Sequence, residues 1–193
     1  MIVAVEDALS EAVAQRLVTT VRPDLTIWSV MGKRGQGYLQ KRRQELNTLA
    51  QNVVVFLLID QDVPARCGPE RIRTWFPTGV SPHLLFRVVV MEVESWVMAH
   101  REALAASLQI SENDIPLRPD TIARPKEHLV GLARSSRSSK VRADLVPSRG
   151  STATVGPAYN PHLVDFVTTT WHPYDAAANS PSLQTTIGRL YLI

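Results

Sequence analysis

The sequence predicts an α/β fold, in which helices flank a mainly parallel central sheet of about four strands and a helical appendage follows at the C-terminal end. Two observations lead to this fold class. In the first half of the chain, short apolar runs alternate with segments of helical period. The run 53–59 is apolar throughout and rich in β-branched residues, as is typical of a strand buried on both faces of a parallel sheet.

The elements of the first half follow one another in a regular order. Helices are expected where apolar residues recur every three or four positions, as Leu9, Val13, Leu17 and Val21 do. Strands are expected where apolar residues run together between polar or glycine-bearing segments. This gives strands at 1–6, 25–30, 53–59 and 84–91, and helices at 10–21, 38–52, 69–76 and 94–108.

The last third of the chain differs in composition. Prolines punctuate a loop before a brief helix at 126–133, and residues 134–150 are rich in serine and arginine, which predicts a loop. Two more helices are expected at 161–171 and 182–192, the second with Ser180 as N-cap and Pro181 at its first position. We therefore predict an α/β core over 1–115, and over 116–193 a Pro/Arg-rich loop with C-terminal helices packed on that core.

The overall composition is that of a globular protein. Hydrophobic residues make up 45% of the 193 positions and charged residues 20%. No apolar stretch approaches the roughly 18 residues of a membrane span, and the N-terminus lacks the basic region of a signal peptide. Cys67 is the one cysteine, which fits a reducing cytoplasm. We expect a cytoplasmic protein without a membrane partner, and the sequence leaves homo-oligomerisation open.

Acidic residues follow three of the predicted strands. Glu6 ends the first strand, Asp60 and Asp62 follow the third, and Glu94 follows the fourth. Because open α/β sheets bind ligands outside the carboxyl ends of their strands, these acids are expected to meet there. Carboxylate oxygens suit Mg²⁺ or Mn²⁺. The alternative is that the aspartates are helix caps or turn residues, and the sequence leaves it open.

Basic residues mark three candidate nucleic-acid contacts. The loop Gly32–Gly37 carries Lys33 and Arg34, and is either a phosphate cradle or a solvated turn. Lys126 is either a phosphate contact or an ordinary helix lysine. A serine-spaced series is suited to contacts with phosphates rather than bases, although such runs are also common as solvated loops. Its members are Arg134, Arg137, Lys140 and Arg142.

Several motifs carry a resemblance to a known family. Residues 5–11 are similar to the Toprim pattern, in which a glutamate at a strand end is followed by a small or acidic turn into a helix, although Asp7 stands where glycine is usual. Asp60-x-Asp62 is similar to the Toprim Asp-x-Asp. The chain also resembles DUF4276, a group of small Toprim-like proteins often considered with phage-defence nucleases. That likeness lies in Glu92-x-Glu94-x-Trp96, Pro125-Lys126 and Ser180-x-Ser182-Leu183.

The resemblance implies a metal-dependent phosphodiester hydrolase, a nuclease that acts on nucleic acid in a defence system. Asp60 and Asp62 would hold one or two Mg²⁺ ions, and Glu6 would be a ligand or the base that activates water. Glu94 would be an additional ligand. Small Toprim proteins of this kind lack their own ATPase, so an ATPase is implied as a partner protein.

Two other hypotheses stay open. A strand followed by Asp-x-Asp also occurs in haloacid-dehalogenase-type phosphatases, where the first aspartate is the nucleophile. In those proteins the motif normally lies on the first strand and a downstream acidic pair completes the site, and neither feature is present here. The second hypothesis is a non-catalytic partner or regulatory subunit of an ATPase-containing complex, with a degenerate Toprim-like site.

Overall fold

The computed structural model of the chain describes residues 1–61 and 68–193, and these residues form two compact units. Unit 1 comprises Met1–Val90 and Thr185–Ile193, and unit 2 comprises Met91–Gln184. The division after residue 115 that the composition suggested follows the change to a Pro/Arg-rich sequence, whereas these units follow spatial proximity. The two units are described separately below.

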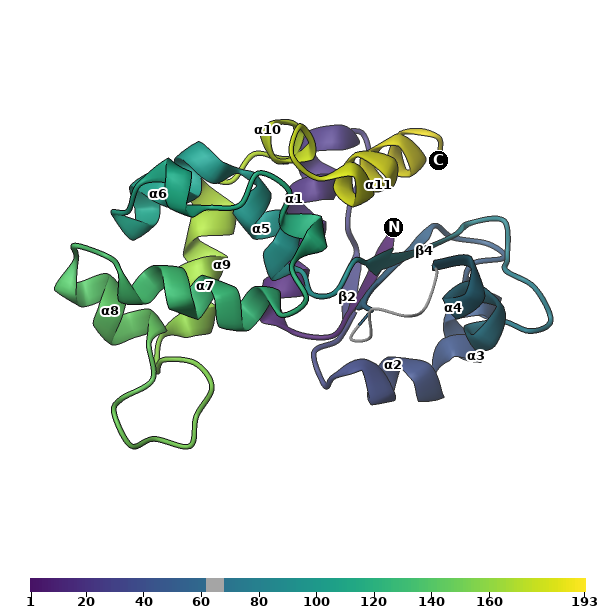
Figure 1. The fold of residues 1–193 in the computed structure, drawn as a ribbon. Coiled ribbons are helices and arrows are strands. Elements are labelled where there is room, and N and C mark those ends of the chain that lie inside the picture. Colours follow the sequence, from purple (N-terminus) through teal and green to yellow (C-terminus); the bar gives the residue numbers. More distant parts are fainter. Residues whose placement is uncertain (62–67) are drawn as a thin grey trace. The chain divides into compact units, whose positions relative to one another are not determined.

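Unit 1 contains a four-stranded parallel sheet with the strand order β2-β1-β3-β4 (Figure 1). This confirms the predicted α/β class, the parallel sheet and the number of strands. Its strands are β1 (Ile2–Val5), β2 (Ser29–Gly32), β3 (Val55–Asp60) and β4 (Leu84–Val89), and its helices are α1 (Ala8–Val21), α2 (Gln36–Lys41), α3 (Arg43–Leu49) and α4 (Gly68–Trp75).

The central strand β3 is buried at every position because helices cover both faces of the sheet. On one face, Leu57 packs in a cluster with Leu39 and Leu46 of α2 and α3, and with Trp75 of α4. On the other face lies α1, whose apolar side, including Leu17, is fully buried. Each such fully buried aliphatic side chain contributes about 1.5–3 kcal/mol to folding. The three layers hold the carboxyl ends of the strands in fixed positions.

Two predicted elements of unit 1 were wrong in their bounds. The strand expected at 25–30 lies at Ser29–Gly32, because the Leu25 N–H donates to the Arg22 carbonyl and forms a turn there. It ends at Gly32, where a Cβ would lie 2.0 Å from the Val5 carbonyl oxygen and φ is +105°. The helix expected at 38–52 is divided at Arg42 into α2 and α3.

Unit 2 is helical, which confirms the predicted helical C-terminal region (Figure 1). Two fully buried tryptophans lie in its core, and the Trp171 indole N–H donates to the Trp96 carbonyl at 3.1 Å. No helix of the described residues is long and apolar enough to cross a membrane. The helices are α5 (Glu94–Ala99), α6 (Arg101–Leu108), α7 (Pro125–Arg134), α8 (Ser139–Leu145), α9 (Tyr159–Thr169), α10 (Pro173–Ala177) and the start of α11 (Pro181–Tyr191), with 3₁₀ turns at Glu112–Asp114 and Pro119–Thr121.

The expected helix 94–108 is broken at His100, whose ψ of 70° is not helical and whose Nδ1 accepts the His172 N–H at 3.0 Å. The segment 134–150 is not all loop, because α8 lies within it. The Ser138 hydroxyl caps α8, and Val141 and Leu145, one helical turn apart, are both buried.

The predicted cap of the last helix is confirmed. The Ser180 hydroxyl accepts the Leu183 N–H at 3.2 Å, and Pro181 is the first residue of α11. Serine satisfies an N–H that the first turn of the helix would otherwise leave without a partner, and proline has no N–H to satisfy. The cap and the first residue of α11 could therefore be predicted from the sequence, although the expected range began one residue later, at 182.

Candidate metal and phosphate site

Glu6 and Asp60 meet at the carboxyl end of the sheet in unit 1. They follow or end the adjacent strands β1 and β3, which pair in parallel with Ala4 opposite Leu57. The Glu6 Oε1 atom accepts the backbone N–H of Asp60 at 2.8 Å. The prediction that these two strand ends are neighbours is therefore confirmed, and it rests on the parallel geometry of the sheet.

Gln36 joins these two strand ends, and it was not among the residues predicted from the sequence. Its Nε2 atom donates to Glu6 Oε1 at 3.1 Å and to the Asp60 carbonyl at 2.9 Å. Gln36 is the first residue of α2 and follows Gly35, whose φ of +76° allows the chain to turn into the helix. The sequence contained one indication that Gln36 belongs to this site. Gln36 lies at the end of a glycine-rich loop after β2, and β2 also ends at this edge of the sheet.

Arg71 brings a buried positive charge to the same network. It lies on α4, is 9% exposed, and one of its terminal nitrogens donates to the Gln36 Oε1 atom. Its Nε is buried and has no hydrogen-bond partner among the residues described, and no carboxylate of those residues forms an ion pair with it. A guanidinium remains protonated and burying it is costly, so this position suits an anion beside it.

The basic loop after β2 uses two of its N–H groups within unit 1. The Lys33 N–H donates to the Val5 carbonyl at 2.9 Å, and the Gly35 N–H donates to the Glu6 carbonyl at 3.0 Å. These two groups therefore hold the loop against β1 instead of facing a phosphate. The Lys33 ammonium lies 3.1 Å from Glu11, and Arg34 is exposed with its guanidinium over the ring of Tyr38, 5.5 Å from its centroid.

The oxygen donors at the strand ends fit a hard cation in kind. Glu6 and Asp60 lie within one network, and the third predicted donor, Asp62, lies outside the described residues. Within residues 1–61 and 68–193, no three Asp, Glu, His or Cys side chains form a group that could hold a metal ion. A metal site here therefore depends on Asp62. Carboxylates alone, without histidine or cysteine, would favour Mg²⁺ or Mn²⁺ over zinc.

Glu94, the fourth predicted metal ligand, belongs to unit 2, where it lies beside Lys126. Its side chain is 2% exposed, and its Oε1 atom lies 3.1 Å from the Tyr159 hydroxyl, which donates to it, and 3.5 Å from the Lys126 ammonium. The Glu92 carboxylate accepts the Lys126 backbone N–H at 2.8 Å. Lys126 was predicted to contact phosphate, and here its charge faces Glu94. Tyr159 carried no signal in the sequence because its partner lies 65 residues away.

The motifs that carry the family resemblance in unit 2 are hydrogen-bonded to one another. The Trp96 indole N–H donates to the Ser182 hydroxyl at 2.7 Å. Asp120 accepts the Ser180 hydroxyl at 2.7 Å and the Ser182 N–H at 2.9 Å. These contacts connect α5 with the start of α11, so the residues around Trp96 and Ser182 form one structural cluster of the helical unit.

The basic series lies on α7, α8 and the turn between them, and its members are exposed. Arg134 also lines a cavity of about 400 Å³ with Val130 and Thr154. The Arg142 guanidinium donates to the Ser136 carbonyl, so this arginine also holds the turn. Exposed cations such as these are the groups through which proteins bind phosphate backbones.

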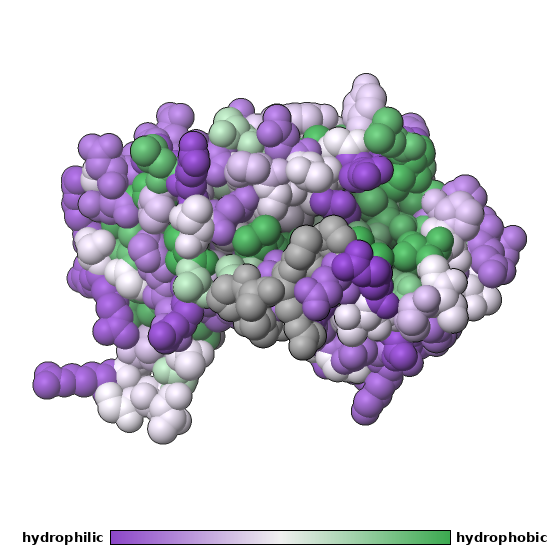
Figure 2. All heavy atoms as spheres, turned by 45° about the vertical axis from the view of Figure 1, so that its right-hand side comes forward, coloured by the Kyte–Doolittle hydropathy of each residue, from purple (hydrophilic) through white to green (hydrophobic). Residues whose placement is uncertain are grey.

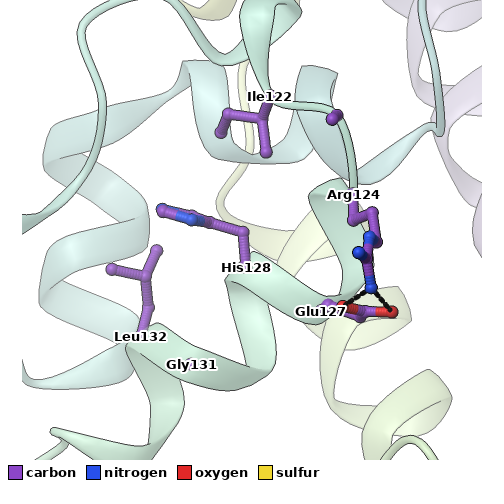
Figure 3. A pocket seen from close by; sticks show the side chains of 7 residues that line it. Ile122, Arg124, Glu127, His128, Gly131 and Leu132 are labelled. Atoms are coloured by element: carbon purple, nitrogen blue, oxygen red, sulfur yellow. Dashed lines mark hydrogen bonds and ion pairs between the residues drawn. The ribbon is translucent and has the colours of Figure 1, made fainter. Parts of the chain in front are cut away.

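A second cavity of about 480 Å³ lies along α7 in unit 2 (Figure 3). The His128 side chain extends between Ile122 and Leu132, away from the ion pair of Arg124 and Glu127 (Figure 3). Because the one arginine of this cavity is paired with the one glutamate, it has no net charge to attract an ionic ligand.

Comparisons of the chain with protein-family models, with curated proteins and with solved structures gave no match. The resemblance to DUF4276 and to Toprim proteins therefore stays a prediction from the motifs.

Proposed function

We propose that the protein is a divalent-metal-dependent phosphodiester hydrolase, a Toprim-like nuclease whose site lies at the carboxyl ends of β1 and β3. The observation that supports it best is the network in which Glu6 and Asp60 meet, with the buried Arg71 reached through Gln36. Acids at strand ends beside a buried arginine suit a metal ion and a phosphate group together.

In this proposal, Glu6, Asp60 and Asp62 hold Mg²⁺ or Mn²⁺. A divalent ion held by these residues would supply stabilisation of the charge on the attacking and leaving oxygens. Arg71 binds the substrate phosphate, because its guanidinium is buried at this edge and is not neutralised by a described carboxylate. Glu6 positions or deprotonates the attacking water.

Manganese binding, measured by isothermal titration, tests the metal site directly. Glu6→Gln removes the charge but keeps an oxygen that can accept the Asp60 and Gln36 hydrogen bonds. We expect this variant, Asp60→Asn and Asp62→Asn each to weaken Mn²⁺ binding at least about tenfold while the fold stays intact. Glu70→Gln, an exposed acid on α4, is the matched control and should bind as the unaltered chain does.

Cleavage of single- and double-stranded DNA and RNA, with Mg²⁺ or Mn²⁺, tests the activity. Arg71→Met should lose cleavage but keep Mn²⁺ binding, whereas Arg73→Met, an exposed arginine two residues later on the same helix, should lose neither. The assay is run with and without a candidate ATPase partner, since the implied defence system would supply one. Absence of cleavage in both, with Mn²⁺ affinity unchanged by Glu6→Gln, would favour the non-catalytic subunit.

Nucleic-acid binding by the basic series is tested through its salt dependence. Replacing Arg134, Arg137 and Lys140 together with alanine should weaken binding and lower the slope of log affinity against log salt by roughly one unit for each phosphate that the variant no longer neutralises. Arg142 is left in place because it also holds the turn at Ser136. An unchanged slope would show that these residues do not contact phosphates.

A further inference from the structure

Two arginines of unit 1 lie together without a carboxylate partner among the described residues. The Arg87 Nε on β4 donates to the Thr186 hydroxyl of α11 at 3.1 Å, and Arg189 lies almost one helical turn after Thr186. In the part of the chain that the structure describes, no carboxylate forms an ion pair with either guanidinium. Burial and, to a smaller extent, the charge of Arg189 lower the pKa of Arg87 from its ordinary value. The pair therefore favours an anion at this position.

Both arginines line a cavity of about 390 Å³, within the range of ligand pockets. The cavity also touches Ile72, Val80 and the strand residues Leu84–Phe86. Successive residues of a strand face opposite sides of the sheet, so a cavity that touches four successive residues of β4 runs along its outer edge. Figure 2 shows hydrophobic and strongly hydrophilic residues side by side at its upper right, over the C-terminal end of α11.

The outer edge of β4 presents backbone groups as well as side chains. β4 is the terminal strand of the sheet, and the carbonyls of His83 and Val89 accept N–H groups of the chain segment that contains β3. Because the direction of these groups alternates along a strand, the N–H and C=O groups of Phe86 and Val88 point away from β3. A segment beside β4 would therefore meet both hydrogen-bonding groups and a charged cavity.

We propose that the outer edge of β4 binds an extended acidic peptide, which adds to the sheet as a fifth strand. Backbone hydrogen bonds would supply affinity, and alternate side chains would supply specificity. On the side of the sheet where α11 lies, a carboxylate of the peptide would lie between Arg87 and Arg189. Side chains of neighbouring strands are close enough for such a contact. On the opposite face, apolar side chains would contact Ile72, Val80 and Phe86. The preferred peptide therefore alternates acidic and apolar residues.

The positive charge of Arg87 and Arg189 favours an acidic peptide over a second copy of the chain as the partner of this edge. If two copies paired through β4 about a two-fold axis, the arginine pairs of both copies would be brought to the same short interface. Like charges opposite one another destabilise strand pairs. This proposal is independent of the proposed hydrolase, because the cavity lies along residues 84–87 of β4 and the metal donors lie at the carboxyl ends of β1 and β3.

The probe is a labelled peptide of alternating valine and glutamate, compared with one in which glutamine replaces glutamate. We expect the acidic peptide to bind by fluorescence polarisation, and the glutamine peptide to bind at least about tenfold more weakly. Arg189→Gln should cause a similar loss, and so should Arg87→Met if it folds. Arg73→Gln removes an exposed charge from α4 and is the control that should bind normally. The Phe86 amide should gain protection from hydrogen exchange only with the acidic peptide.

Three results would overturn the proposal. Equal binding of both peptides would show that the arginines do not select acids. Binding of inorganic phosphate or benzoate as tight as that of the peptide, without protection of Phe86, would indicate a small-oxyanion site. No peptide binding would mean that Arg87 serves only to hold α11 on β4, or, if sedimentation gives twice the mass of the chain, that a second copy covers the edge.

Discussion

Replacing Gln36 by methionine tests whether the network at the strand ends is formed as described. Methionine has a similar length but no hydrogen-bonding amide, so the change removes the bonds to Glu6, to the Asp60 carbonyl and from Arg71. A hydrogen bond to a charged group contributes about 1.5–3 kcal/mol and a neutral one about 0.5–1.5 kcal/mol. The three share one side chain and are not additive, so we expect about 2–4 kcal/mol of destabilisation.

The free energy of unfolding is measured by urea denaturation, followed by tryptophan fluorescence, to which Trp75, buried in unit 1, contributes. Hydrogen exchange of the β3 amides assigns the loss to the sheet. Gln40→Met is the matched control, because Gln40 lies on the same helix and is exposed, and it should change stability by no more than about 0.5 kcal/mol. A loss in Gln36→Met as small as that of the control would refute the network.

Three further predictions concern unit 2. Tyr159→Phe should cost about 1.5–3 kcal/mol in urea denaturation, because the buried Glu94 loses a donor, whereas Tyr191→Phe, at a residue that is 67% exposed, should cost almost nothing. Ser180→Ala should cost about 1–2 kcal/mol through loss of the cap of α11, and an unchanged midpoint would contradict the cap. Burial lowers the pKa of His100, opposed by the charge of Asp175, and its Nδ1 accepts an N–H. Its neutral form is therefore favoured in the fold, so stability should be lost as the pH falls below about 6.5, the ordinary pKa of histidine. His100→Gln should flatten this dependence between pH 7.5 and 5.5, and His83→Gln, at an exposed position, should not.

The sheet could be predicted because its central strands are apolar on both faces. β3 needs no alternation to be recognised, since a parallel strand between two layers of helices buries every side chain. The edge strand β2 is only partly buried, so its apolar pattern is weak, and its start was predicted four residues and its end two residues too early. At the break in the helix, His100 accepts a hydrogen bond from His172, which lies 72 residues away, so no local sequence pattern predicts this contact.

The candidate site was predictable in part for the same reason. Parallel strands place the residues that follow them at one edge, so Glu6 and Asp60 could be assigned to one site from sequence. The place of Gln36 after the glycine-rich loop was a signal, but the contacts of Gln36 and Arg71 could not be predicted, because they depend on how the loop before α2 turns and on where α4 packs. Tyr159 and Glu94 are likewise brought together only by the packing of α9 in unit 2.

The charge balance at the strand ends decides between a metal site and a purely structural network. Glu6 already accepts two hydrogen bonds, and Gln36 connects it to the positive charge of Arg71, so this part of the network is stable without a cation. Asp60 is largely buried as well, and it joins the network through its backbone N–H and carbonyl. In the proposed metal site, the carboxylates of Asp60 and Asp62 would come close to that of Glu6. Close carboxylates disfavour one another's charged form, and a divalent cation removes that repulsion. Asp62 is therefore the residue on which the metal site depends, and the difference in Mn²⁺ affinity between the Asp62→Asn and Glu70→Gln variants measures that dependence.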